Sequence, residues 1–337
     1  MKNKKIILAI TSDVKLYECF IKNLEFHNYE VQLICATGSS KYPSLGHKIY
    51  SFLRKIFLND RNYKKKISQI YNSKLYLEQI KNLDQSNAAI FIRPDLFTIE
   101  IINITKEKTN KIIAYQWDGL NRFPNVKELI PLFDRFYIFQ KKDQDLYNHK
   151  YYPITNFYFD CYQNEIFKNS VIEYDLFYIG SYDDRINHLL EICDFLDKKG
   201  LKLKILLRTK KKKNLKKYSF IEFFKNPLSY KENLELVAKS RILLDIHHTN
   251  IHDGLSFRIF EAIGYNKKII STNVKIKEYD IYCSNNVFCF ENNFNDLNNF
   301  INTNIENYPS ELKNKYSFKN WIEYILEEPN AIPIHNH

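Results

Sequence analysis

The strongest constraint on the fold is a strand–helix–strand pattern that occurs twice, about 170 residues apart. Residues 5–35 and 175–207 each begin with an apolar run, pass through a polar loop into a helical pattern, and end in a second apolar run. Such a unit requires parallel strands, and parallel sheets are covered by helices on both faces. The pattern therefore predicts an α/β chain with two Rossmann-like, doubly wound domains facing a central cleft.

The length and the later apolar runs fit this division. A chain of 337 residues allows about two domains. We expect a first domain at 1–160 and a second at 172–310, with the join inside the aromatic stretch 150–174. Residues 311–330 read as an amphipathic helix that packs back toward the first domain, with one apolar side made of Phe318, Trp321, Ile322 and Ile325.

Composition indicates the compartment and the kind of partner. No run approaches the roughly 20 apolar residues that a membrane span requires. The basic start meets Asp13 where a signal peptide would carry a small-residue cleavage site, so we interpret it as a first strand. Six scattered cysteines without a CxxC pair are typical of free thiols in the cytoplasm. The formal charge of +11 suits an anionic partner, whether nucleic acid, membrane or phosphorylated substrate.

Ligands of open α/β sheets bind beyond the carboxyl ends of the strands, which directs attention to the loops there. The stretch 253–273, DGLSFRIFEAIGYNKKIISTN, holds two of only seven glycines. Its helix begins near Leu255 or Ser256, and the free N–H groups of a helix start favour an anion such as a diphosphate. Gly254 lets that anion approach closely, and Gly264 reads as the helix C-cap.

Two charged residues in this helix have two interpretations. Arg258 can bind a phosphate, and Glu261, one turn later on the same face, can accept hydrogen bonds from the hydroxyls of a ribose. Alternatively, Ser256 is an ordinary N-cap and Arg258 and Glu261 form an ordinary helix ion pair. The residues alone leave both interpretations open.

The pattern D-G-x-S-x-R-x-x-E-A-x-G-x-x-K-x-I-x-T resembles the second domain of GT-B glycosyltransferases of the group-1 type, in which an acid, seven residues and a Glu are followed by Ala and Gly. Asp253 and Glu261 have that spacing, although the first acid is Asp and not Glu. The run DLFYIGSYDDR is similar to the loop that opens their donor domain. The run from YQWDG to FQKKD resembles bacterial proteins of lipopolysaccharide and capsule biosynthesis and the CgeB-like group.

The resemblance implies a sugar transferase whose second domain holds a nucleotide sugar, with no cofactor and no essential metal. Backbone N–H groups of Gly180 and Ser181 would approach the diphosphate, and arginines would offset the charge that develops on the leaving nucleotide. The expected donor-binding residues are Gly180, Ser181, Arg185, Arg208, Tyr230, His248, Asp253, Gly254, Leu255, Ser256, Arg258 and Glu261. Each has a structural alternative; Tyr230 and His248 in particular also fit packing and loop roles. The pair Asp143 and Asp145 falls in a predicted helix, which argues against a metal-binding loop.

The first domain would bind the acceptor, a bacterial surface glycan or its lipid-linked form. An inverting transfer needs a base to remove the proton of the acceptor hydroxyl. Asp118 is the first candidate and Asp13 the second, and both also fit turn or N-cap roles. The sequence leaves the stereochemistry open.

A basic, apolar segment bears on location. Residues 47–58 place Ile49, Phe52, Leu53, Ile56 and Phe57 on one helical stripe, bordered by Lys48, Arg54 and Lys55 and followed by Lys64–Lys66. This pattern fits a helix that lies on an anionic membrane surface, which would make the protein peripheral on the inner membrane. It fits equally a helix packed on its own core. Two other classes remain: a catalytically inactive GT-B partner of another transferase, and a nucleic-acid-binding protein, for which no recognised motif is present.

Overall fold

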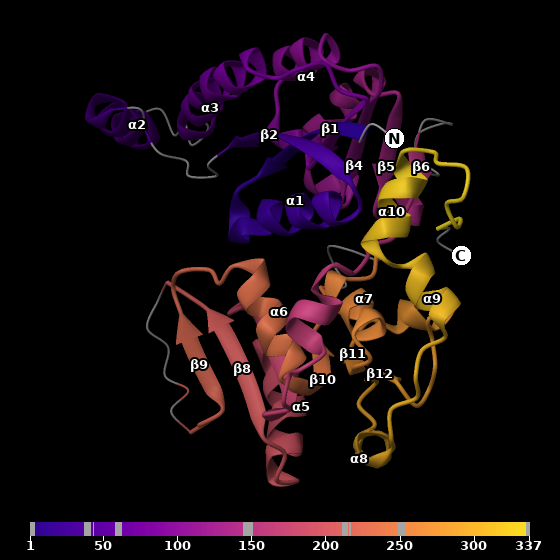
Figure 1. Ribbon diagram of the computed structural model, residues 1–337. Helices are drawn as coiled ribbons and strands as arrows, with labels where there is room; N and C mark the ends of the chain where they lie inside the picture. Colours follow the sequence, from indigo (N-terminus) through magenta and orange to yellow (C-terminus); the bar gives the residue numbers. More distant parts are fainter. Residues whose placement is uncertain are drawn as a thin grey trace. The chain divides into compact units, whose positions relative to one another are not determined.

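The computed structural model describes residues 4–36, 42, 44–57, 63–143, 151–210, 215, 217–248 and 254–334. The chain forms two compact units (Figure 1). The first comprises Met1–Ile138 and Asp143–Tyr152, and the second comprises Phe139–Lys142 and Pro153–His337. Each unit contains one six-stranded sheet, and every strand pair whose register is defined is parallel. The two predicted Rossmann-like domains are therefore confirmed.

The first sheet has the strand order β2-β1-β3-β4-β5-β6. Its strands are β1 (Lys4–Thr11), β2 (Tyr29–Ala36), β3 (Ala88–Ile92), β4 (Ile112–Gln116), β5 (Arg135–Ile138) and β6 (Tyr151–Pro153). The central strands β3 and β4 are buried along their whole length, because helices cover both faces. The chain leaves β1 in one direction for β2 and returns on its other side as β3, so the order reverses between β1 and β3.

The helices of the first unit are α1 (Leu16–Phe26), α2 (Leu45–Phe57), α3 (Tyr63–Lys81) and α4 (Ile99–Lys106). Ile7 and Ala9 of β1 belong to one hydrophobic core cluster with α3 and α4. The alternate residues Ile6 and Leu8 are also buried, on the face that α1 covers (Figure 1). Apolar residues on both faces of one strand are the reason that its sequence reads as a continuous apolar run.

The second sheet has the order β12-β11-β10-β7-β8-β9. Its strands are β7 (Tyr174–Ser181), β8 (Leu203–Arg208), β9 (Ile221–Phe224), β10 (Ser240–Asp245), β11 (Lys268–Ser271) and β12 (Val287–Cys289). Counted from its own first strand, this is the Rossmann order 3-2-1-4-5-6, and the order reverses between β7 and β10. The helices of this unit are α5 (Ile186–Lys198), α6 (Tyr230–Ala238), α7 (Phe257–Gly264), α8 (Phe294–Asn302), α9 (Ser310–Lys315) and α10 (Phe318–Ile325).

The chain passes into the second unit for the last time between Tyr152 and Pro153, earlier than the expected end of the first domain at residue 160. The aromatic residues that follow belong to the second unit because they pack on α10: the rings of Phe157 and Trp321 lie 4.5 Å apart, and those of Phe157 and Phe318 lie 5.1 Å apart. The apolar side of α10 is fully buried as the spacing predicts. Its expected approach to the first domain stays a prediction.

Helix α2 does not fit one of its two interpretations, that of a helix packed on its own core. Its apolar stripe does not pack on the core of its unit, because the buried side of the helix is the side of Ser51. Phe52, Ile56 and Phe57 are exposed. The side chains of Lys64–Lys66 lie outside the part of the chain that the structure describes. No helix within that described part combines the length and apolarity needed to cross a membrane. All six cysteines are free thiols.

Candidate functional site

The second unit places two arginines at the reversal point between β7 and β10. Arg185 follows β7, and its Nη1 donates to the carbonyl oxygen of Ile246, at the end of β10, at 2.7 Å. Arg258 follows β10, and its Nη2 donates to the carbonyl oxygen of Ile179, near the end of β7, at 2.7 Å. Each arginine therefore comes from one strand and is fixed on the other, at the edge where ligands of this fold bind.

Arg185 is oriented by an acid beside it. Its Nε and Nη2 donate to the two carboxylate oxygens of Asp183 at 2.9 and 2.6 Å. This bidentate bond is the main cause of the lowered pKa of Asp183 and of the raised pKa of Arg185. A guanidinium has five N–H donors, and three of those of Arg185 are used. The remaining two N–H groups can donate to a further oxyanion.

Arg258 is oriented by a ring and a buried acid. Its guanidinium carbon lies 5.1 Å from the ring centre of Tyr178, and its Nη1 lies 3.6 Å from Oδ1 of Asp245. Asp245 is buried and accepts hydrogen bonds from the hydroxyls of Ser256 at 2.9 Å and Ser271 at 2.8 Å. The N-cap interpretation of Ser256 is therefore wrong in one respect: the residue occupies the N-cap position, but its hydroxyl binds Asp245 and not a helix N–H.

Glu261 does not form the ion pair that its spacing from Arg258 suggests. It is 3% exposed, and its Oε1 accepts a hydrogen bond from the Tyr230 hydroxyl. Burial raises the pKa of Glu261, although the Tyr230 bond and the Arg258 charge oppose the shift. The ring of Tyr230 packs edge-on against Phe159 and Phe257. Tyr230 and Glu261, both predicted to bind the donor, are thus hydrogen-bonded to each other. Tyr230 has the packing role that was its alternative interpretation.

The other predicted residues of the second unit spread around this edge. Ser181 and Arg208 end the paired strands β7 and β8 in register, both exposed, and no described residue pairs with the Arg208 guanidinium. Gly180 lies beside Tyr178, where a Cβ atom would fall 2.3 Å from the hydroxyl oxygen of Tyr178. His248 is partly exposed after β10 and lies 3.4 Å from a carboxylate oxygen of Asp184.

The start of the 253–273 stretch is less open than its sequence suggests. Asp253 lies outside the described residues. Leu255 is buried, and its carbonyl oxygen accepts from the side chain of Asn156 at 3.0 Å. A Cβ atom at Gly254 would fall 2.4 Å from the ring of Phe139, so this glycine serves packing.

Gly264 has a different role from the predicted C-cap. The cap residue of α7 is Tyr265, and Asn266 carries the positive φ of 53°. A Cβ atom at Gly264 would fall 2.1 Å from the ring of Tyr158. The glycine is therefore required by a close aromatic contact and not by backbone conformation.

The first unit gathers charged residues at the corresponding edge of its sheet. Arg93 follows β3 and binds both oxygens of Asp95, at 2.6 and 2.7 Å. Its Nη1 lies 3.0 Å from Oδ2 of Asp118, while Nη1 of Arg122 donates to Oδ1 of Asp118 at 2.7 Å. Asp118, the first candidate for a base, is 8% exposed and has a guanidinium on each oxygen. A carboxylate held in this way is better suited to orienting the arginines than to removing a proton.

Asp13, the second candidate, lies at the reversal point between β1 and β3 and is exposed. Burial lowers the pKa of Arg93, but the Asp95 hydrogen bonds and the charges of Asp95, Asp118 and Asp13 outweigh it and leave that pKa raised. Val14 and Lys15 adopt positive φ of 47° and 52°, and Arg93 has φ 61°. Left-handed backbone at non-glycine residues costs about 1–3 kcal/mol each and is concentrated at functional sites.

Two acidic groups resemble metal sites in sequence or position. Asp143 is buried, and its Oδ2 accepts from the backbone N–H of Leu120 at 2.9 Å; its predicted companion Asp145 lies outside the described residues. Asp183, Asp184 and His248 bring possible ligand atoms within 4.8 Å of one another. Both oxygens of Asp183 already bind Arg185, so a cation there would compete with a guanidinium.

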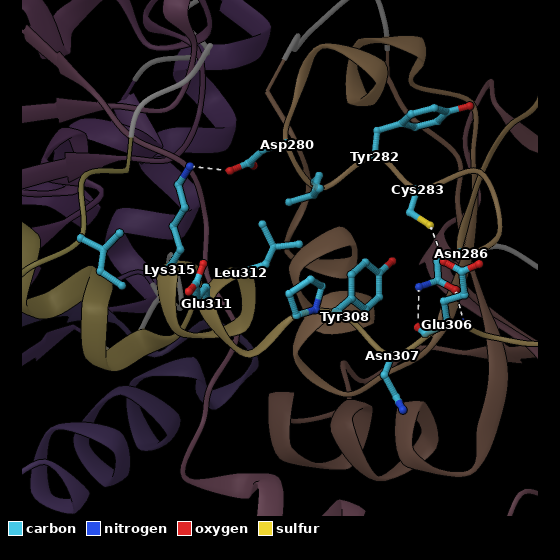
Figure 2. Close-up of a pocket in the computed structure, with 13 residues that line it drawn as sticks. Asp280, Tyr282, Cys283, Asn286, Glu306, Asn307, Tyr308, Glu311, Leu312 and Lys315 are labelled. Carbon is cyan, nitrogen blue, oxygen red and sulfur yellow. Dashed lines mark hydrogen bonds and ion pairs between the residues drawn. The ribbon is translucent and has the colours of Figure 1, made fainter.

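A separate cavity of about 730 Å³ lies beside the start of β12, in the second unit (Figure 2). Tyr282, Tyr308 and Leu312 contribute to its wall, and its polar groups largely bind each other, as Lys315 does Asp280 at 2.5 Å. Because parallel strands all start at one edge of a sheet, this cavity is at the opposite edge from the arginine pair. None of the predicted site residues lines it.

Sequence reasoning missed Asp183, Asp245 and Arg122. Asp245 carries a usable signal, because it is an acid at the end of an otherwise apolar strand. Asp183 lies two residues before Arg185, in a loop whose acids are abundant and individually uninformative. No local pattern distinguishes Arg122, whose partner Asp118 was itself assigned a different role.

No protein-family description matches the chain, and no curated protein matches its sequence. Solved structures do match. An α-glucosyltransferase in complex with UDP and a 13-mer DNA containing an A:G mismatch has a TM-score of 0.53 at 11% identity, covering 89% of this chain and 90% of that one. A UDP-forming α,α-trehalose-phosphate synthase from Burkholderia xenovorans, in complex with glucose-6-phosphate, has a TM-score of 0.52 at 9% identity, with coverages of 90% and 93%. At these identities the similarity establishes the fold, which is the GT-B fold.

Proposed function

We propose that this chain is a glycosyltransferase that takes a sugar from a nucleotide-sugar donor bound at the edge of the second unit. The observation that carries the proposal is the pair of arginines fixed across β7 and β10, Arg185 and Arg258, at the reversal point of a Rossmann sheet. Similarity to a UDP-bound α-glucosyltransferase and a UDP-forming synthase supports a nucleoside diphosphate as the leaving group.

In this proposal the arginines replace a metal. As the bond between the sugar and the diphosphate breaks, negative charge grows on the leaving phosphate. The spare N–H groups of Arg185 and Arg258, with exposed Arg208 at the end of β8, offset that charge from fixed positions. Backbone N–H groups near Gly180 and Ser181 add donors. No cofactor is needed, and turnover persists in EDTA.

In this proposal Glu261 does not contact the donor but positions the residues that do. Its hydrogen bond with Tyr230 fixes α6 to α7, the helix that carries Arg258. A direct role toward the ribose requires Tyr230 to release the carboxylate, so we propose positioning as its first role.

On the acceptor side, we propose Asp13 as the base of an inverting transfer, ahead of Asp118. Asp13 is exposed after β1, whereas both oxygens of Asp118 bind arginines. We further propose that the acceptor is a bacterial surface glycan, lipopolysaccharide or capsule, assembled in the cytoplasm or on the inner face of the membrane. The resemblance of the run from YQWDG to FQKKD supports this acceptor class.

A thermal-shift panel of UDP, GDP, ADP and dTDP sugars tests the donor proposal. A true donor at one hundred times its Kd stabilises the fold by about 2.7 kcal/mol, whereas the other nucleotides have little effect. A panel without any shift, repeated by calorimetry without heat of binding, contradicts the proposal. Release of nucleoside diphosphate in the presence of glycan acceptors then distinguishes an active transferase from an inactive partner of another transferase.

A further inference from the structure

Helix α2 presents an apolar face that no described residue of its unit covers. Leu45, Ile49, Phe52 and Ile56 recur at positions i, i+4, i+7 and i+11, which places them on one side of a helix about 20 Å long. Their exposed fractions are 72%, 54%, 61% and 57%, and that of neighbouring Phe57 is 76%. A contiguous exposed apolar surface of this kind marks an interaction site.

Contacts beside and behind the apolar face fix α2 to the first unit, so that face has a defined direction. Ser51 is buried and accepts a hydrogen bond from the Tyr42 hydroxyl at 2.8 Å. The ring of Tyr50 meets that of Tyr63 on α3 edge-on at 5.0 Å, and the Arg54 guanidinium lies 5.4 Å from the same ring. Figure 1 shows α2 beside the start of α3.

The border of the apolar face is cationic. Lys48 and Lys55 are seven positions apart, on one edge of the stripe, and both are exposed. Together with the hydrogen-bonded pair Tyr42 and Ser51 and the apolar residues Leu45, Ile49 and Phe52, they line a groove of about 500 Å³. The helix sequence, LGHKIYSFLRKIF, contains no acidic residue. The groove thus joins an apolar floor to two ammonium groups, which is the chemistry that a lipid with an anionic headgroup requires.

We propose that α2 is an interfacial helix that binds the surface of a membrane containing anionic lipid. Leu45, Ile49, Phe52 and Ile56 enter the boundary between headgroups and acyl chains, and Lys48 and Lys55 bind lipid phosphates. The charge pattern favours a membrane over a second copy of the chain, because two α2 helices face to face would bring cations together with no acid to pair them. This inference goes beyond sugar transfer and does not depend on it.

Sedimentation with lipid vesicles tests the inference. We expect the full chain to bind vesicles of phosphatidylcholine with 30% phosphatidylglycerol, to bind pure phosphatidylcholine weakly, and to lose binding as salt rises. Replacing Lys48→Gln and Lys55→Gln together lowers the partition coefficient by about tenfold or more. Phe52→Ser with Ile56→Ser lowers it at least as much.

A matched control removes the same charge elsewhere. Lys225→Gln with Lys319→Gln changes two exposed lysines of the second unit and leaves vesicle binding unchanged. Because the changed α2 side chains are exposed, all variants keep the wild-type melting temperature and nucleotide-sugar response. Loss of vesicle binding with an unchanged nucleotide response supports this inference whatever the sugar specificity.

Three results contradict it. One is a wild-type chain that ignores anionic vesicles at low salt. Another is a Phe52→Ser and Ile56→Ser variant that binds vesicles like the wild type but converts a dimer into a monomer in light scattering, which assigns the face to a second copy. Equal binding to neutral and anionic vesicles would likewise refute the proposed roles of Lys48 and Lys55.

Discussion

The carboxyl edges of the two sheets use arginine in different ways. In the first unit, Arg93 and Arg122 together hold both oxygens of Asp118, and an exposed acid, Asp13, follows β1. In the second unit, Arg185 and Arg258 each bind a backbone carbonyl of the neighbouring strand and keep further N–H donors. The same fold thus builds an edge with an available carboxylate and an edge with available cationic donors.

This contrast teaches that the residue type alone does not set the function of a strand-end loop. In the first unit two guanidinium groups converge on one acid, Asp118, whereas in the second unit Arg185 and Arg258 each have an acid of their own and also bind a carbonyl oxygen across the sheet. The arginines of the second unit keep further N–H donors. If the proposed function is correct, the first edge serves the acceptor proton and the second edge serves the donor anion.

The largest expected effect comes from Asp13. Asp13→Asn removes the proposed base and lowers kcat by about a hundredfold or more, because general-base catalysis contributes about 10²–10⁴. Donor affinity stays unchanged, since the residue is in the other unit. Steady-state kinetics with calorimetry of donor binding measures both quantities.

Asp118→Asn is the comparison for this experiment. It disturbs the Arg93 and Arg122 pairs and lowers the melting temperature, with a smaller effect on kcat. If Asp118→Asn abolishes turnover in a folded protein while Asp13→Asn does not, the order proposed from the sequence is correct and the contrast between the two edges fails.

The next effect concerns the donor edge. In the proposed function, Arg185→Ala and Arg258→Ala each remove a charge-assisted hydrogen bond to the donor diphosphate, which costs about 1.5–3 kcal/mol, or roughly ten- to a hundred-fold in Kd. Calorimetric titration with the donor identified by thermal shift measures the change.

Arg241→Ala provides the control. Arg241 also binds a backbone carbonyl, that of Ile301 at 3.0 Å, and pairs with Asp175 at 3.4 Å, but it lies at the start of β10 and not at its end. The Arg241→Ala variant should be less stable than the wild type but should bind the donor with unchanged affinity. Equal weakening of donor binding by all three variants would mean that the effect comes from general loosening of the sheet.

The smallest effect concerns the pH dependence of stability through Glu261. Its raised pKa means that the folded state favours the protonated form more than the unfolded state does. Its contribution to stability is therefore fully present below the ordinary pKa of 4.5 and is lost as pH rises through the raised value. Glu261→Gln mimics the protonated form, so its stability relative to wild type increases with pH across that window and then levels off.

Urea unfolding at a series of pH values measures this dependence. Glu306→Gln is the control, because it makes the same change at an exposed acid of the second unit. If the stability difference between Glu261→Gln and wild type does not vary with pH, the pKa of Glu261 is the same in the folded and the unfolded protein, which contradicts the prediction.

Local patterns predicted much of the fold. The helical spacing of α10 and the apolar run of β10 appear in the structure within a few residues, because burial of one helix face or of a whole strand is set by neighbouring residues. The loops after β7 and β10 were likewise located, because polar residues that follow a buried strand mark its carboxyl end. The hydrogen bond between Tyr230 and Glu261 could not be predicted, since it joins residues 31 positions apart on different helices.

The sequence by itself determined that this chain folds into two Rossmann-like units, and that polar and charged loops end their strands, because both follow from the spacing of apolar residues. The tertiary structure decided which charges remain available. Strand order brought Arg185 to Ile246 and Arg93 to Asp118, and helix orientation turned the apolar side of α2 outward. Those outcomes depend on contacts between residues distant in the chain, which no local periodicity encodes.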